Sequence, residues 1–124
     1  MYSKSLENLV ATVFESIGFV THHPMQMLKH PLADSLLSYV LTRPEANSKY
    51  IGVIVRDWKR IAGKDQVYKA EELLQVCPKL NQVFIISSMG FSLSSKHIAE
   101  KKEKITLISK KELISLMLKK LEIL

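Results

Sequence analysis

One unbroken apolar run, Tyr50–Val55, limits the possible folds of this chain more than any other feature. A strand with one solvent-facing side alternates apolar and polar residues, so a continuous run predicts a strand buried on both faces. Val83–Ile86 is a second run of the same kind. Strands buried on both faces need helices on each side of their sheet. The sequence therefore favours an α/β domain.

Helical periodicity predicts the covering layers. Apolar residues recur at helical spacing from Leu6 to Ile17, which is typical of an amphipathic helix. Ser109 and Glu112 have the spacing of a capping box and predict the start of a last helix. The expected order of elements is α-β-β-β-α-β-α-β-α. Further strands are expected at 19–21, 35–42 and 105–108, further helices at 64–77 and 93–102, a loop at 22–30 and a hairpin turn at 43–49.

Length, charge and cysteine content narrow the class of protein. With 124 residues, the chain is expected to form a single domain, residues 1–124. The net charge of +6 suits a polyanion or an acidic surface. The single cysteine, Cys77, excludes an internal disulfide and fits a reducing compartment, so a cytoplasmic location is expected. No run of apolar residues is long enough for a transmembrane helix.

Basic residues follow the first apolar run. Arg56, Lys59, Arg60 and Lys64 are expected at a strand end and at the N-terminus of the following helix. Cationic side chains, exposed amides and the helix dipole all favour an anion at such a place. The cluster therefore predicts contacts with a phosphate backbone, with an affinity that falls as salt is added. Trp58 is expected either to stack beside these cations or to pack under the helix.

Two stretches and the order of elements resemble the Mrr-like restriction endonucleases of the PD-(D/E)xK superfamily. VIVRDWKRIAGKDQV, Val53–Val67, resembles the stretch in which a central strand bears Glu-x-Lys. Val83–Leu113, with its SSMGFS turn, resembles the next strand, turn, helix, short strand and final helix of that family. The resemblance implies a restriction-endonuclease-like α-β-β-β-α-β core, with a mixed sheet flanked by helices. It also implies DNA as the partner, a prokaryotic source and, in an active member, Mg²⁺.

The resemblance also assigns site residues. Asp34 and Glu7 lie where the family keeps acidic metal ligands. Ile54 and Arg56 fall at the glutamate and lysine positions of Glu-x-Lys; isoleucine cannot ligate a metal, and arginine suits a phosphate better than proton transfer. The candidate catalytic residues are Asp34, Arg56 and Glu72. Gln66 and Lys69 are implied as further contacts with the DNA backbone.

Several alternatives stay open. The first hypothesis is a DNA-binding, nuclease-like domain with impaired or lost catalysis. The second is an active Mg²⁺-dependent endonuclease with rearranged ligands, Asp34 with Glu71 or Glu72. The third is a protein-interaction subunit, a homodimer formed through the wide apolar face of the C-terminal helix. Two other arrangements are Asp57-x-Lys59 turned by a β-bulge and a metal site of His22, His23 and His30.

Overall fold

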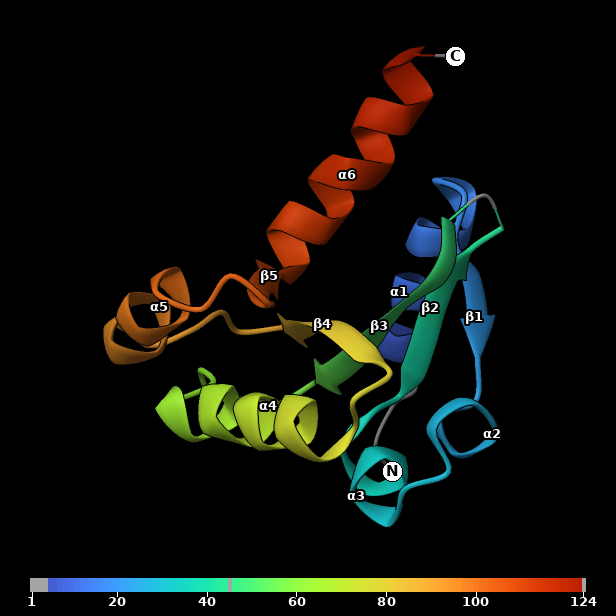
Figure 1. Cartoon of the computed structure of the whole chain (residues 1–124). Helices are drawn as coiled ribbons and strands as arrows, with labels where there is room; N and C mark the ends of the chain where they lie inside the picture. The colour runs from blue at the N-terminus through green and yellow to red at the C-terminus, as the bar shows by residue number, and fades with distance from the viewer. Residues whose placement is uncertain (1–4, 45, 124) are drawn as a thin grey trace.

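A five-stranded sheet with helices on both faces forms the fold (Figure 1). The computed structural model describes residues 5–44 and 46–123, and the side chains of residues 5–44 and 49–119. The architecture confirms the mixed α/β class and its restriction-endonuclease-like order. The elements are α1 Ser5–Ser16, β1 Val20–His22, α2 Pro24–Leu28, α3 Pro31–Leu36, β2 Tyr39–Arg43, β3 Ala46–Arg56, α4 Lys64–Val76, β4 Leu80–Ser87, α5 Leu93–Glu100, β5 Ile105–Ser109 and α6 Lys110–Ile123.

β3 is the central strand of this sheet. Strands β1, β2 and β3 form an antiparallel meander, and β4 and β5 continue the sheet parallel to β3. Val53 and Ile54 are fully buried, as the apolar run predicts for a strand covered on both faces. The carboxyl end of β3, at Arg56, therefore lies beside the carboxyl end of β4, at Ser87.

Two hydrophobic clusters cover the two faces of the sheet. Ile54 points into the cluster formed with α2, α3, α4 and α5. Val53 and Val55 point into the cluster formed with α1 and α6. This division follows from the alternation of side chains along a strand, and it places Arg56 on the same side as Ile54.

The segment between β1 and β2 differs from the expected loop and strand. Two short helices, α2 and α3, fill it, and β2 begins only at Tyr39. Each helix starts with proline at its first position, which suits the helical φ angle. The ring nitrogens Nδ1 of His23 and His30 accept hydrogen bonds from the amides of Met25 and Leu32. Asp34 thus lies in a helix, and its expected place at the start of a strand was wrong.

The last helix begins as expected. The amide of Ser109 donates to Oε1 of Glu112 at 3.0 Å, and the amide of Glu112 donates to Oγ of Ser109 at 3.1 Å, which confirms the capping box. Leu113 is buried against the sheet, and the helix then extends away from it (Figure 1). Within the described residues, every helix is too short or too polar to span a bilayer.

Candidate nucleic-acid interface

The candidate site lies where β3 ends and α4 begins. Arg56 is the last residue of β3, a loop of residues 57–63 follows, and α4 starts at Lys64. Gly63 is the N-cap of α4 and contributes no side-chain hydrogen bond. The amide of Gln66 donates to the carbonyl oxygen of Gly63 at 3.1 Å, and no side-chain cap is supplied at this end of the helix, which is the end that favours anions.

A hydrogen-bond network fixes the Arg56 side chain. Its Nε donates to Oε1 of Gln66 at 2.8 Å, and Nε2 of Gln66 donates to Oδ2 of Asp65 at 3.0 Å. A longer contact of 3.4 Å joins Arg56 to the carbonyl oxygen of Val55. Gln66 is only 1% exposed, so its amide serves the interior of the protein. Gln66 thus holds Arg56 in place, and the expected direct contact of Gln66 with a DNA backbone does not fit its burial.

The charge of Arg56 is partly shielded. Burial lowers the pKa of the guanidinium, and the nearby carboxylate of Asp65 opposes that shift. An arginine keeps its proton at neutral pH in proteins, so Arg56 remains a cation. It cannot act as the proton-transferring lysine of a Glu-x-Lys motif, but it can bind an anion at the strand end.

Trp58 joins Arg56 to the exposed cations of the loop. The guanidinium carbon of Arg60 lies 4.4 Å from the centre of the Trp58 ring, and that of Arg56 lies 5.3 Å from it. Both distances are within the range of cation–π attraction. Trp58 is half-buried against the cluster under α4, so both interpretations of this tryptophan hold in part.

The loop that follows β4 is hydrogen-bonded to the loop that follows β3. The hydroxyl of Ser88 donates to the carbonyl oxygen of Trp58 at 2.9 Å, and the Ser88 amide donates to that of Arg56 at 3.1 Å. The amide of Ala62 donates to the carbonyl oxygen of Gly90, and the carbonyl oxygen of Ala62 accepts from the amide of Ser92. The loops 57–63 and 88–92 are therefore joined into one surface, which we call the joined loops.

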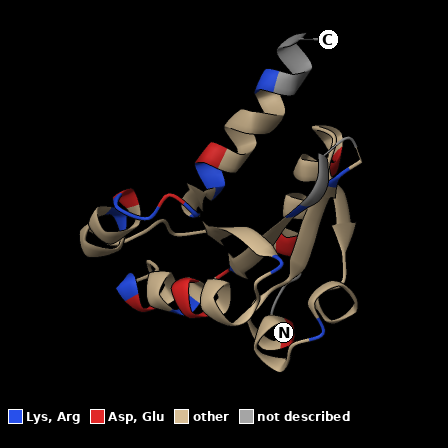
Figure 2. Ribbon diagram, viewed as in Figure 1, with Lys and Arg blue, Asp and Glu red and all other residues tan. Residues whose placement is uncertain are grey.

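Exposed cations surround the network. The side chains of Lys59, Arg60, Lys64 and Lys69 are all exposed. Figure 2 shows Lys and Arg at the start of α4 and farther along it. Six residues were expected to contact nucleic acid. The side chains of Lys59, Arg60, Lys64 and Lys69 are exposed and that of Arg56 is half-buried, whereas Gln66 is buried.

The expected acidic ligands do not meet. Asp34 is exposed on α3, which packs through Ala33 on the side of Ile54. Glu7 lies on α1, which covers the opposite face of the sheet. Burial, with smaller contributions from Glu7 and Glu15, raises the pKa of Tyr39, so the charge of Glu7 acts on that face. Among the described side chains, those of residues 5–44 and 49–119, no three His, Cys, Asp or Glu side chains gather as metal ligands.

The two glutamates of α4 also lie away from Arg56. Glu71 forms an ion pair with Lys102, beyond the end of α5. Glu72 is exposed, whereas Gln66, Val67, Ala70 and Leu73 form the buried face of the helix. Mg²⁺ needs oxygen ligands around one point, and the residues at the expected motif positions do not supply them.

The residues of the remaining alternatives are either exposed or already hydrogen-bonded. Asp57 and Lys59 are exposed in the loop after β3, without a β-bulge that turns them toward Ile54. His22 is 2.7 Å from the hydroxyl of Thr42, and His23 and His30 cap α2 and α3. On α6, Ile114 and Leu118 are 40% and 54% exposed, and the side chains beyond residue 119 lie outside the described residues.

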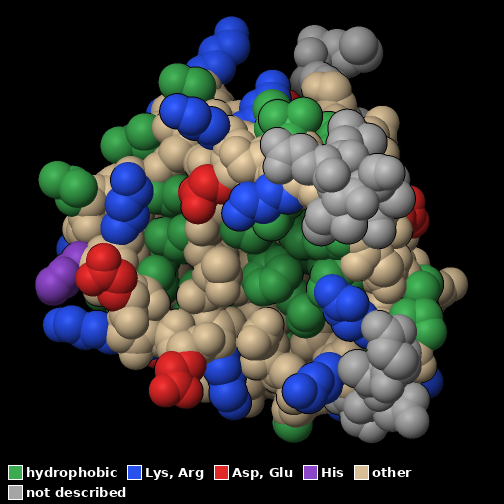
Figure 3. Space-filling view, turned by 90° about the horizontal axis from the view of Figure 1, so that it is seen from above, with side chains coloured by type: hydrophobic (Ala, Val, Ile, Leu, Met, Phe, Trp, Pro, Cys, Tyr) green, Lys and Arg blue, Asp and Glu red, His purple; other side chains and the backbone are tan. Residues whose placement is uncertain are grey.

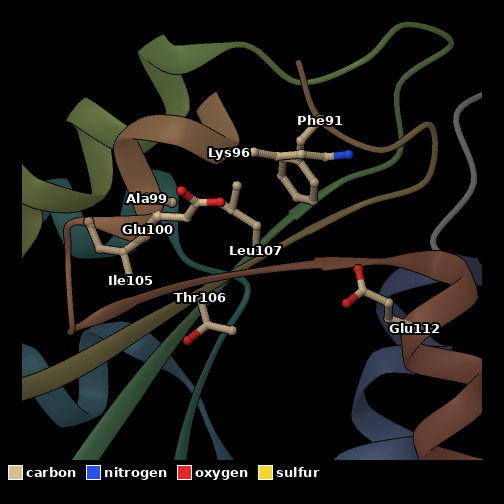
Figure 4. Close-up of a pocket in the computed structure, with 8 residues that line it drawn as sticks. All are labelled: Phe91, Lys96, Ala99, Glu100, Ile105, Thr106, Leu107 and Glu112. Carbon is tan, nitrogen blue, oxygen red and sulfur yellow. The ribbon is translucent and has the colours of Figure 1, made fainter. Parts of the chain in front are cut away.

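A hollow of about 440 Å³ lies next to the joined loops, between α5, β5 and the start of α6. Figure 4 shows the Lys96 side chain extending beside the ring of Phe91, with Glu100 nearby and Glu112 across the hollow. Glu112 already accepts a hydrogen bond in the capping box of α6. The hollow presents a mixture of charges with no set of groups that converges on one ligand.

The role of Gln66 was missed from the sequence. Buried positions of α4 are 66, 67, 70 and 73, which is a helical stripe. The resemblance placed Gln66 among the contacts with a DNA backbone, and glutamine is usually exposed, so a buried role was not expected. Its place one residue before Val67, on the same helical face, was the available signal.

Comparisons with known proteins bear on the family and on the fold. The family model Mrr_cat, described as restriction endonuclease, matches residues 1–117. Among solved structures, the chain is similar to the crystal structure of a protein of unknown function, AF1548, with a TM-score of 0.69 and 16% identity. The match covers 94% of this chain and 65% of the other, so this chain spans about two thirds of that length. No curated protein matches.

Proposed function

This chain belongs to the Mrr_cat family of restriction endonucleases, and from that premise we propose that it is a DNA-binding domain whose cleavage chemistry is impaired or lost. The observation behind the proposal is the pair at the motif positions. Ile54 is fully buried where a metal-binding glutamate would stand, and Arg56 is bonded to Gln66 where a free lysine would stand. Membership of the family implies a nuclease-like fold. Ile54 and Arg56 argue against metal-dependent cleavage of DNA.

The surface that remains suits a phosphate backbone. Lys59, Arg60 and Lys64 are exposed beside the N-terminus of α4, and Arg56 is held rigidly behind them. Each cation that neutralises a phosphate releases condensed counterions, so binding weakens as salt rises. Such contacts position a domain on DNA without reading its sequence.

Binding to duplex DNA tests the proposal. We expect retardation that weakens between about 50 and 200 mM salt, with a logarithmic slope of about 0.9 for each cation in contact. The triple variant Lys59→Gln, Arg60→Gln, Lys64→Gln should bind less tightly and with a slope reduced by about 2 to 3. Lys79→Gln, Lys110→Gln, Lys111→Gln changes the net charge equally at exposed positions outside the site and should retain most of the affinity.

Two results would contradict the proposal. Equal loss of affinity in the two triple variants would mean that net charge, and not the site, attracts DNA. Nicking of supercoiled plasmid with Mg²⁺ or Mn²⁺ that EDTA stops and Asp34→Ala abolishes would show that the chain retains its chemistry. In that case a rearranged set of ligands, as in the alternative with Asp34, would replace the reading of lost catalysis.

A further inference from the structure

Large exposed hydrophobic side chains concentrate at the joined loops. Leu93, at 83%, is the most exposed of the large hydrophobic residues that the structure describes, and Met89 and Ile61 are 54% and 52% exposed. Single exposed apolar residues are ordinary on a protein surface. Ile61 and Met89 lie on two loops that are hydrogen-bonded to each other, and Leu93 is the first residue of α5, directly after the second loop; together they form a local feature, which we call the apolar tip.

The backbone explains why these residues lie close together. Ala62 forms a bridge with Phe91, so Ile61 lies beside the turn that bears Met89. Gly90, with a φ of 84°, makes that turn possible and leaves open space beside it. Leu93 follows directly after Ser92, the N-cap of α5, whose amide bonds to Ala62.

Folding does not require the tip to be apolar. Within the same turn and helix start, Phe91 and Ser95 are the residues that enter the interior, at 9% and 0% exposure. The cap of α5 is supplied by the hydroxyl of Ser92, which accepts from the Ser95 amide. Met89 and Leu93 therefore face solvent at the cost of exposed apolar surface, which points to a ligand that covers them.

Exposed charged residues flank the tip along the chain, and the cations outnumber the carboxylates of Asp57 and Asp65. Lys59, Arg60 and Lys64 lie on the first loop and the start of α4, and Lys96 lies one turn after Leu93. Figure 3 shows hydrophobic side chains at the left edge of the molecule, the side on which α4 and α5 lie in Figure 1, together with Lys and Arg and with acidic and His side chains. A ligand that covers this surface needs apolar faces with negative charge beside them.

We propose that the apolar tip contacts unstacked bases, so that this domain prefers DNA with unpaired or distorted bases over intact duplex. The inference rests on the proposed DNA binding. In a regular duplex the base faces are hidden in the stack, and only phosphates and groove edges are offered. Unpaired bases expose apolar faces beside phosphates, and apolar side chains of other DNA-binding proteins contact bases at disrupted steps.

Paired DNA probes test this preference. Affinity is measured by fluorescence anisotropy for a short duplex and for the same duplex with a bulge of unpaired nucleotides. We expect the bulged duplex to bind about tenfold more tightly, which is the order expected when one exposed Leu or Met side chain is buried against a base. The variant Met89→Ser, Leu93→Ser should lose about that tenfold preference and bind the plain duplex as before. Val76→Ser, Leu118→Ser removes exposed apolar residues elsewhere and should keep the preference.

The outcomes separate this inference from the proposed function. Equal affinity of the unchanged protein for both probes, or equal weakening of both by Met89→Ser, Leu93→Ser, overturns the preference and leaves DNA binding intact. Absence of binding to either probe at low salt overturns both. Sedimentation with phosphatidylglycerol vesicles that needs Met89 and Leu93, without a preference for the bulge, would assign the tip to a membrane surface instead.

Discussion

A buried glutamine decides what Arg56 can do. Gln66 accepts from the guanidinium on one side and donates to Asp65 on the other, so its amide has a partner at each end. A buried amide without partners would be costly, and here each polar atom of the site that is fully buried is satisfied within the described residues. The network therefore serves stability and orientation together.

Replacing Gln66 by leucine should reveal both roles. Gln66→Leu keeps a side chain of similar size in the interior and removes the acceptor of the Arg56 Nε. We expect the free energy of unfolding to fall by about 1 to 2 kcal/mol, because a hydrogen bond to a charged group is lost. DNA affinity should fall several-fold, since Arg56 is no longer held in one position. Urea unfolding and anisotropy measure the two effects.

A control lies on the same helix. Gln75 is exposed on α4, so Gln75→Leu should leave the free energy of unfolding within about 0.5 kcal/mol of the unchanged protein. Equal stability of the Gln66→Leu and Gln75→Leu variants would mean that the Arg56 network contributes nothing to the fold.

Among the elements, β3 and the end of α3 depend on one small residue. Gly52 lies within β3 on the side of Ile54, and a Cβ atom placed there would lie 2.9 Å from Cδ2 of Leu37 and 3.3 Å from Cδ1 of Leu80. Leu37, directly after α3, is 6% exposed. The missing side chain at Gly52 is therefore what lets the chain after α3 pack closely on the central strand.

Adding that one carbon atom should strain the packing. Gly52→Ala is expected to lower the free energy of unfolding by about 1 kcal/mol, because the buried leucines must shift. Leu37→Ala should cost about 2 to 4 kcal/mol through the cavity that it leaves. The double variant should cost less than the sum of the two, since Leu37→Ala removes the clash. Strictly additive costs in urea unfolding would show that Gly52 and Leu37 do not interact.

Across the whole molecule, the two hydrophobic clusters share the strands of one sheet. Val53 and Ile54 are neighbours in β3, yet one belongs to the cluster with α1 and α6 and the other to the cluster with α4. If β3 separated from either cluster, the hydrophobic residues of the other cluster would also be exposed. This shared strand supports the interpretation of residues 1–124 as one domain.

Unfolding should accordingly be a single transition. Trp58 is the one tryptophan of the chain and reports on the candidate site, whereas far-UV circular dichroism reports on all helices and strands. The two signals should give the same midpoint in urea, as expected for a two-state domain. Separate midpoints would mean that the joined loops and α4 unfold independently of the sheet, and the interpretation as one cooperative domain would be wrong.

The sequence by itself determined the class of fold and the positions of most elements. Tyr50–Val55 and Val83–Ile86 became buried parts of β3 and β4, and the spacing of Ser109 and Glu112 gave the cap of α6. These features depend on neighbours along the chain, and their period is set by helix or strand geometry. Strand parity also places Ile54 and Arg56 on one side of β3, whereas their assignment to the Glu-x-Lys positions rests on the resemblance.

Only the tertiary structure decided which polar residues meet. Asp34 was expected at a strand and lies on α3, because Pro31 and the ring of His30 start a helix there. Gln66 turned inward because Arg56 was available as its partner. The joined loops combine segments about thirty residues apart, through backbone hydrogen bonds that any residue type could make. Such long-range pairings produce no periodic pattern in a sequence, so the sequence could not predict them. They form because the sheet places the ends of β3 and β4 side by side.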